Sequence, residues 1–294
     1  MIVKLLLGVL GVLTLYFLFF FVKDVAANKE AMANEKASWA KSGAIGAFVN
    51  FFDTLGIGSF APATALLDFF KQLDHDRLLP GTLNVSCTIP VLTEAFIFIQ
   101  SVEVEPITLF SMVAAAVVGS FVGSRTVSKL PENKVQFYMG LALLVTAALM
   151  LLRQFGALDA LGSGNEAIGL SGISLVIAVV VNFFLGALMT IGVGLYAPCM
   201  ALVYMLGLNP LVAFPIMMAS CAGLMPVASA EFIKAGAYCR KSSIAITLGG
   251  IVGVIIAAKF VTGLPMNVLT IIITLVVIYT AITYIRKSKQ SAAA

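Results

Sequence analysis

Charged residues are scarce in this chain. Only 11% of its 294 residues are Asp, Glu, Lys or Arg, whereas soluble domains carry about 25%. The apolar fraction is 61%, against roughly 45–50% in soluble domains. A water-soluble fold has too little interior to hide that much apolar surface, so the composition excludes an ordinary soluble globular domain.

Motifs for enzymatic chemistry are also missing from the sequence. It has no Walker loop, no dinucleotide-binding fingerprint and no Ser/His/Asp arrangement, and its four cysteines show neither CxxC nor zinc-type spacing. We therefore expect no enzymatic activity, no cofactor and no metal site. The net charge of +4 does not indicate a nucleic-acid partner, because most Lys and Arg residues lie in loops between apolar runs.

Long apolar runs dominate the sequence instead. Each is long enough to cross the roughly 30 Å of a bilayer's hydrocarbon core as a helix. The runs are Ile2–Val22, Ile107–Ser124, Val135–Leu152, Ile168–Met189, Leu211–Ala230, Ile244–Phe260 and Val268–Ile285. We therefore predict an all-α, polytopic protein of the cytoplasmic (inner) membrane, with the lipid bilayer as its surroundings.

Two halves of the chain repeat short motifs in the same order, which indicates an internal duplication. The strongest motif is a Gly-x-Gly break that leads to Ala-Pro. The shared motifs are VNFF at Val49–Phe52 and Val181–Phe184, the break at Gly56–Pro62 and Gly192–Pro198, proline at Pro90 and Pro226, and Gly-x-x-x-Gly at Gly119–Gly123 and Gly249–Gly253.

The loop charges indicate that the two halves have opposite orientations. Loops 101–106, 156–167 and 207–210 contain no Lys or Arg, whereas the other loops are basic. If all basic loops lie in the cytoplasm, successive loops alternate correctly between the two sides of the membrane only when each break forms a hairpin that returns to the side from which it entered. Each half is then a broken-helix hairpin plus three transmembrane helices, and the two halves form an inverted repeat, as in many secondary transporters.

This organisation predicts six segments. The first apolar run is followed by Lys23-Asp24 and not by a polar cleavage region, so we interpret it as an uncleaved extra helix. The segments are an N-terminal transmembrane helix (1–22), a cytoplasmic linker (23–42), the first repeat (43–155), an extracytoplasmic connector (156–167), the second repeat (168–286) and a cytoplasmic tail (287–294).

The two breaks are the candidate substrate site. A helix that restarts after a break presents unpaired N–H groups and the positive end of its dipole, which together hold an anion. The alternative is that the glycines only permit close helix contacts. With nearby hydroxyls and amides as further donors, the candidate substrate-binding residues are Gly56, Gly58, Ser59, Pro62, Asn84, Ser86, Thr88, Gly192, Gly194, Tyr196, Pro198 and Ser220.

Three acidic residues in apolar segments are candidates for proton coupling, because an ionisable group is costly to place in a membrane. Glu94 lies four residues beyond Pro90 and Glu231 five beyond Pro226, so the two nearly match across the repeat, and Asp53 lies three residues before the first break. Glu231 is equally well explained by an interfacial ion pair with Lys234. Asp53 is equally well placed to bond the backbone amides of the break.

The repeated pattern resembles the TauE/SafE sulfite exporter family of membrane transporters. The two glycine-rich breaks, followed by LPENKVQFYMGLALLVTAALMLLR in one half and LPMNVLTIIITLVVIYTAITYIR in the other, are similar to that family over about residues 43–286. The first helix is then an addition. The family's denser GxGGG pattern is reduced here to Gly56-Ile-Gly58-Ser59. The resemblance implies transport of sulfite, sulfonates or related sulfur-containing anions.

The sequence therefore favours a secondary transporter that moves a small anionic, sulfur-containing substrate by alternating access, with Glu94 linking transport to protons. A passive anion channel built on the same breaks is one alternative. A membrane sulfur-relay protein that uses Cys87, Cys199 or Cys221 is another. The sequence leaves the oligomeric state open, including a homo-oligomer.

Overall fold

The computed structural model describes residues 2–55, 57–98, 104–157, 160, 163–260 and 266–293. These residues form helices joined by loops, with no strand among them. The helices are α1 (Ile2–Ala27), α2 (Lys29–Asn34), α3 (Trp39–Thr54), α4 (Phe60–Phe69), the 3-10 turn η1 (Asp76–Leu78), α5 (Leu79–Phe98), α6 (Pro106–Val127), α7 (Glu132–Gln154), α9 (Gly172–Met189), α10 (Tyr196–Met205), α11 (Pro210–Lys234), α12 (Arg240–Phe260) and α13 (Met266–Ala293).

Six of these helices are long and apolar enough to cross a membrane. The spans are Lys4–Ala27, Pro106–Val127, Glu132–Leu152, Gly172–Met189, Leu211–Lys234 and Arg240–Lys259. Large apolar side chains also cover the outside of the bundle, as at Leu15 (69% exposed) and Ile173 (79% exposed). An outer surface of this kind is suited to contact with lipid. The chain is a multi-pass membrane protein, which confirms the prediction from composition.

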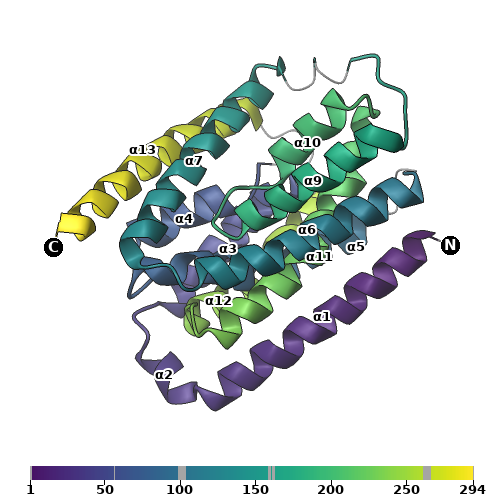
Figure 1. The fold of residues 1–294 in the computed structure, drawn as a ribbon. Coiled ribbons are helices and arrows are strands. Elements are labelled where there is room, and N and C mark those ends of the chain that lie inside the picture. Colours follow the sequence, from purple (N-terminus) through teal and green to yellow (C-terminus); the bar gives the residue numbers. More distant parts are fainter. Residues whose placement is uncertain are drawn as a thin grey trace.

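Helix α11 forms the centre of the bundle. In its apolar window 88% of the residues are buried, whereas the corresponding share in α1 is only 22%. α1 packs along α11, and its Leu6 and Leu10 are buried in that contact. α1 and the α7–α13 pair lie on opposite sides of the bundle (Figure 1). The buried centre is therefore formed by α5 and α11 and the helices packed on them.

The helix pairings correspond between the two halves of the chain. α3 packs on α12 and α9 packs on α6, while α5 packs on α12 and α11 packs on α6. The short helices follow the same scheme, because α4 contacts α13 and α10 contacts α7. The five helices α3 to α7 of the first half correspond in order to α9 to α13 of the second half. Under this correspondence, each contact named above has an equivalent contact in the other half.

Glycines make the closest of these crossings. A Cβ atom at Gly119 on α6 would collide with the carbonyl oxygen of Phe183 on α9. Likewise, a Cβ atom at Gly249 on α12 would collide with the carbonyl oxygen of Gly43 on α3. Small residues at such crossings allow membrane helices to approach closely. The repeated Gly-x-x-x-Gly motif therefore joins helices of different halves in both places.

We expect Gly253→Val to destabilise the bundle. A Cβ atom at Gly253 would collide with the carbonyl oxygen of Ala47, and this backbone atom belongs to a helix and has little room to move. Overpacking of this kind costs about 1–3 kcal/mol, so the thermal midpoint of the detergent-purified protein should fall clearly. Gly8→Val in α1 is the matched control, because nothing lies within 4 Å of a Cβ atom there. Equal midpoints for the two variants would contradict the crossing assignment.

The segment 23–42, predicted as a linker, is tied to the second half of the chain. Asp24 accepts hydrogen bonds from the Tyr238 hydroxyl at 2.6 Å and from Arg240 Nε at 2.7 Å. The Glu35 carboxylate accepts the backbone N–H groups of Arg240 at 2.9 Å and Lys241 at 2.6 Å. A carboxylate at a helix N-terminus is favourable because it pairs with unsatisfied N–H groups. α1 and α2 thereby cap and hold the start of α12.

Candidate functional site

The first break separates α3 from α4. Gly58 has a φ of +93°, a conformation that favours glycine. α4 restarts at Phe60, and Pro62 is its third residue, where a missing N–H leaves no helical bond unmade. The Ser59 side chain does not cap α4 but donates to Asp53 Oδ2 at 2.7 Å. Gly56, a predicted site residue, lies outside the described residues.

The second break separates α9 from α10, and its positive φ lies at the first glycine of the motif, not at the second. Gly192 has a φ of +115°, and a Cβ atom there would lie 2.8 Å from Met139 Cε. α10 restarts at Tyr196 with Pro198 as its third residue, and no side chain caps it. Gly194 differs, because its φ is not positive and nothing lies within 4 Å of a Cβ atom there. Of the two predicted glycines in this break, only Gly192 needs to be glycine for its backbone.

The side chain of Glu94 on α5 joins the two breaks. Its Oε1 atom lies 2.8 Å from the Thr54 hydroxyl, at the end of α3. Its Oε2 atom accepts a hydrogen bond of 3.3 Å from the Tyr196 hydroxyl, at the start of α10. Glu94 is fully buried, as 0% of its surface is exposed. Segments more than 100 residues apart in the sequence thus meet at one carboxyl group.

The hydroxyl of Thr54 has two acceptors and only one proton. It lies 2.8 Å from the carbonyl oxygen of Asn50 and 2.8 Å from Glu94 Oε1. A threonine hydroxyl donates one proton and accepts through its lone pairs. Both contacts are hydrogen bonds when Glu94 is protonated, because Glu94 then donates to the Thr54 hydroxyl and the hydroxyl donates to the Asn50 carbonyl. Without that proton, one of the two acceptors loses its full hydrogen bond.

Three predicted donors form hydrogen bonds elsewhere than at the breaks, as far as the structure describes the chain, and two of them join different helices. Thr88 on α5 bonds Ser229 on α11 at 2.9 Å, and Ser220 on α11 accepts from Asn182 on α9 at 3.1 Å. Asn84 donates to a carbonyl of its own helix. Thr88 and Ser220 are buried at the α5–α11 and α9–α11 contacts, whereas the buried Asn84 has no hydrogen-bond partner for its Oδ1 atom among the described residues.

Ser86 contributes its backbone carbonyl to a contact between α5 and α12. Pro90 lies inside α5 and removes the N–H that would bond the Ser86 carbonyl. The hydroxyl of Thr247 on α12 donates to that carbonyl at 2.9 Å. The carbonyl freed by the proline is therefore used in helix packing.

Glu231 lies in an ion-pair cluster at the end of α11. It contacts Arg125 Nε at 2.6 Å and Lys234 Nζ at 2.8 Å, and the Arg125 side chain is 55% exposed. This is the interfacial pairing that the sequence offered as the alternative to proton coupling. The two glutamates that follow mid-helix prolines thus have different surroundings.

Two asparagines were not singled out from the sequence. Asn50 on α3 and Asn182 on α9 are both fully buried, and neither Oδ1 atom has a hydrogen-bond partner among the described residues. A buried amide without its partner is unusual. The signal was present, because these residues are the Asn of the repeated VNFF motif. Both lie one or two turns before a break.

The four cysteines are free and buried. The Sγ atom of Cys221 lies 3.8 Å from the Sδ atom of Met189, which is the last residue of α9. No group of three or more His, Cys, Asp or Glu side chains within the described residues is arranged to hold a metal ion. Two of the thiols have polar neighbours, because Cys239 Sγ lies 3.2 Å from Glu35 Oε2 and Cys87 Sγ lies 3.7 Å from Ser86 Oγ.

Comparison with known proteins gives one match. A family model described as Sulfite exporter TauE/SafE matches residues 1–150. No curated protein and no solved structure matches the chain. The matched region includes α1, which the sequence resemblance had placed outside the family's range, and it contains the first break and Glu94.

Proposed function

The chain belongs to the sulfite exporter TauE/SafE family of membrane transporters, and from this premise we propose that it is a secondary transporter of sulfur-containing organic or inorganic anions. The substrates are of the sulfite or sulfonate type, and the membrane is the cytoplasmic (inner) membrane. The proposal depends above all on the hydrogen bonds that Glu94 makes with Thr54 at the first break and Tyr196 at the second.

Alternating access requires two halves that move relative to each other about a shared site. The helix pairings that interchange between the halves support an inverted repeat. The two breaks lie at equivalent places in that arrangement, and their side chains meet at Glu94. We infer that the substrate binds between the breaks and that the halves rock around it.

The start of each short helix supplies donors for an anion. Neither α4 nor α10 has a side-chain cap, so the first N–H groups of both helices are available to a ligand. The hydroxyls of Ser59 and Tyr196 lie at these same helix starts. A sulfite or sulfonate group needs several such donors. We propose that it binds at Gly58, Ser59, Gly192 and Tyr196.

Both hydroxyls donate to carboxyl groups. Ser59 donates to Asp53 and Tyr196 donates to Glu94. An incoming anion competes with these carboxylates for the donors and is repelled by their charge. Protonation of Glu94 removes its negative charge and weakens its hydrogen bond from the Tyr196 hydroxyl. We therefore infer that an anion and a proton move together, with Glu94 as the proton carrier and Asp53 as its neighbour at the first break.

Flux measurements on reconstituted protein test this proposal. Liposomes containing the purified protein should take up sulfite or sulfoacetate in a saturable manner. Net flux should run towards the side with the lower proton concentration, because the two ions move in the same direction. Flux that does not saturate and ignores the pH gradient would instead indicate the passive anion channel. Loss of flux on replacing all four cysteines with alanine would indicate the sulfur relay.

A further inference from the structure

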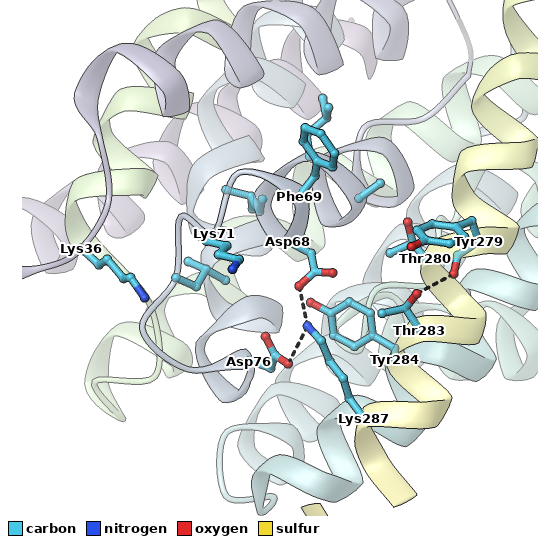
Figure 2. Close-up of a pocket in the computed structure, with 14 residues that line it drawn as sticks. Lys36, Asp68, Phe69, Lys71, Asp76, Tyr279, Thr280, Thr283, Tyr284 and Lys287 are labelled. Carbon is cyan, nitrogen blue, oxygen red and sulfur yellow. Dashed lines mark hydrogen bonds and ion pairs between the residues drawn. The ribbon is translucent and has the colours of Figure 1, made fainter. Parts of the chain in front are cut away.

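A cavity of about 650 Å³ lies between α4 and α13 (Figure 2). Its polar lining comes from both halves of the chain, with Lys36, Asp68 and Lys71 on one side and Tyr284 and Lys287 on the other. We propose that this cavity binds the phosphate headgroup of an anionic phospholipid. This inference does not depend on the proposed function.

The cavity lining carries three ammonium groups, of Lys36, Lys71 and Lys287, and two carboxylates, of Asp68 and Asp76, so its net charge is +1. Lys287 contacts the carboxylates of Asp68 and, at 3.3 Å, Asp76 (Figure 2). Burial lowers the pKa of Lys287, but the hydrogen bond to Asp68 and the two negative charges outweigh this and raise it overall. Lys36 and Lys71 have no carboxylate partner among the described residues. The cavity therefore has a positive side that is not neutralised from within.

Lys71 occupies a backbone position that normally belongs to glycine. Its φ is +51°, and it is the one non-glycine residue with a positive φ in the described part of the chain. It directly follows the C-cap of α4, where Lys71 N bonds Asp68 O and Gln72 N bonds Leu67 O. This pattern is a Schellman motif, in which the residue after the cap is usually glycine.

The second half shows the same motif with the usual residue. After α10, Gly207 has a φ of +88° and bonds Tyr204 O, while Leu208 N bonds Val203 O. A left-handed conformation is unfavourable for a lysine. The first half thus carries a lysine at a position where glycine would suit the backbone better. A requirement for its ammonium group in the cavity explains that choice.

The surroundings of the cavity favour a lipid over a soluble anion. Phe69 and Tyr279 line it from α4 and α13 and are 77% and 73% exposed, so the cavity borders an apolar outer surface. Leu66 and Leu73 give it an apolar part. Tyrosine is typical of the membrane interface, and basic pockets between membrane helices bind anionic lipid headgroups. The lysines suit the phosphate, and the aromatic rim suits the acyl chains.

Lipid binding to the full-length protein tests the proposal. Thermal shift and native mass spectrometry would compare phosphatidylglycerol with phosphatidylcholine in detergent. Phosphatidylglycerol should bind more tightly, and Lys36→Gln combined with Lys71→Gly should weaken it about 30-fold, at about 1 kcal/mol for each basic residue. Lys129→Gln, which removes one exposed charge outside the cavity, should leave binding unchanged.

Lys71→Gly alone separates binding from folding. Its thermal midpoint without lipid should be no lower than that of the unmodified protein, because glycine accepts the left-handed backbone. Its preference for phosphatidylglycerol should nevertheless decrease. Equal phosphatidylglycerol binding by the unmodified protein and the double variant would overturn the proposal. So would a shift of the same size with inorganic phosphate alone that the double variant loses, because the cavity would then be a site for small anions.

Discussion

Glu94→Gln is expected to abolish anion accumulation driven by a proton gradient. With one proton for each anion, the unmodified protein should accumulate substrate by up to about tenfold for each unit of pH difference, since one pH unit corresponds to about 1.36 kcal/mol. The variant should accumulate no substrate, because a glutamine amide does not take up and release a proton as a carboxylate does. It should still exchange labelled for unlabelled anion, as glutamine mimics the protonated glutamate.

The fold should survive this change. A glutamine amide can donate to Thr54 and accept from Tyr196, so the two contacts of Glu94 are kept. Glu231→Gln is the matched control, because Glu231 lies in an ion-pair cluster with Arg125 and Lys234. That variant should accumulate substrate as the unmodified protein does. Proton-driven accumulation by Glu94→Gln at the normal level would rule out Glu94 as the carrier.

Gly192→Val is expected to abolish transport altogether. A β-branched residue at a φ of +115° is strained by about 1–3 kcal/mol, and its side chain also meets Met139. Relief of this strain would rotate the second break and move Tyr196 away from Glu94. Both net uptake and exchange should therefore fall below detection in liposomes, with the helical content by circular dichroism unchanged.

Gly194→Ala is the control for this experiment. Gly194 lies two residues away, has no positive φ and has open space around a Cβ atom, so its transport rate should stay within about twofold of normal. Gly58→Val, at a φ of +93° in the first break, should behave like Gly192→Val. If Gly192→Val transports normally, the second break is not part of the substrate site.

The repeat was visible in the sequence because each copy ends one helix and restarts another with the same types of residue. A helix that stops and restarts requires a residue tolerant of positive φ and accepts a proline in its next first turn. Gly58 with Pro62 and Gly192 with Pro198 meet these needs. The motif did not distinguish Gly192 from Gly194, because both residues are glycine and only the structure shows that Gly192 alone has a positive φ.

The roles of the two glutamates could not be separated from the sequence. Glu94 and Glu231 both follow a mid-helix proline, by four and five residues, and so small a difference in spacing does not predict different roles. Their partners differ because these lie far along the chain. Thr54 and Tyr196 reach Glu94 from the two breaks, while Arg125 reaches Glu231 from the end of α6.

By itself, the sequence determined the all-α membrane class, the positions of both breaks and the family to which the chain belongs. These properties follow from composition, hydropathy and local backbone preference, which each segment carries within itself. Only the tertiary structure decided that both breaks meet at Glu94, that Ser220 and Thr88 hold helices together, and that Lys71 faces a cavity with Lys287. Those outcomes depend on which helices pack together, and no single segment contains that information.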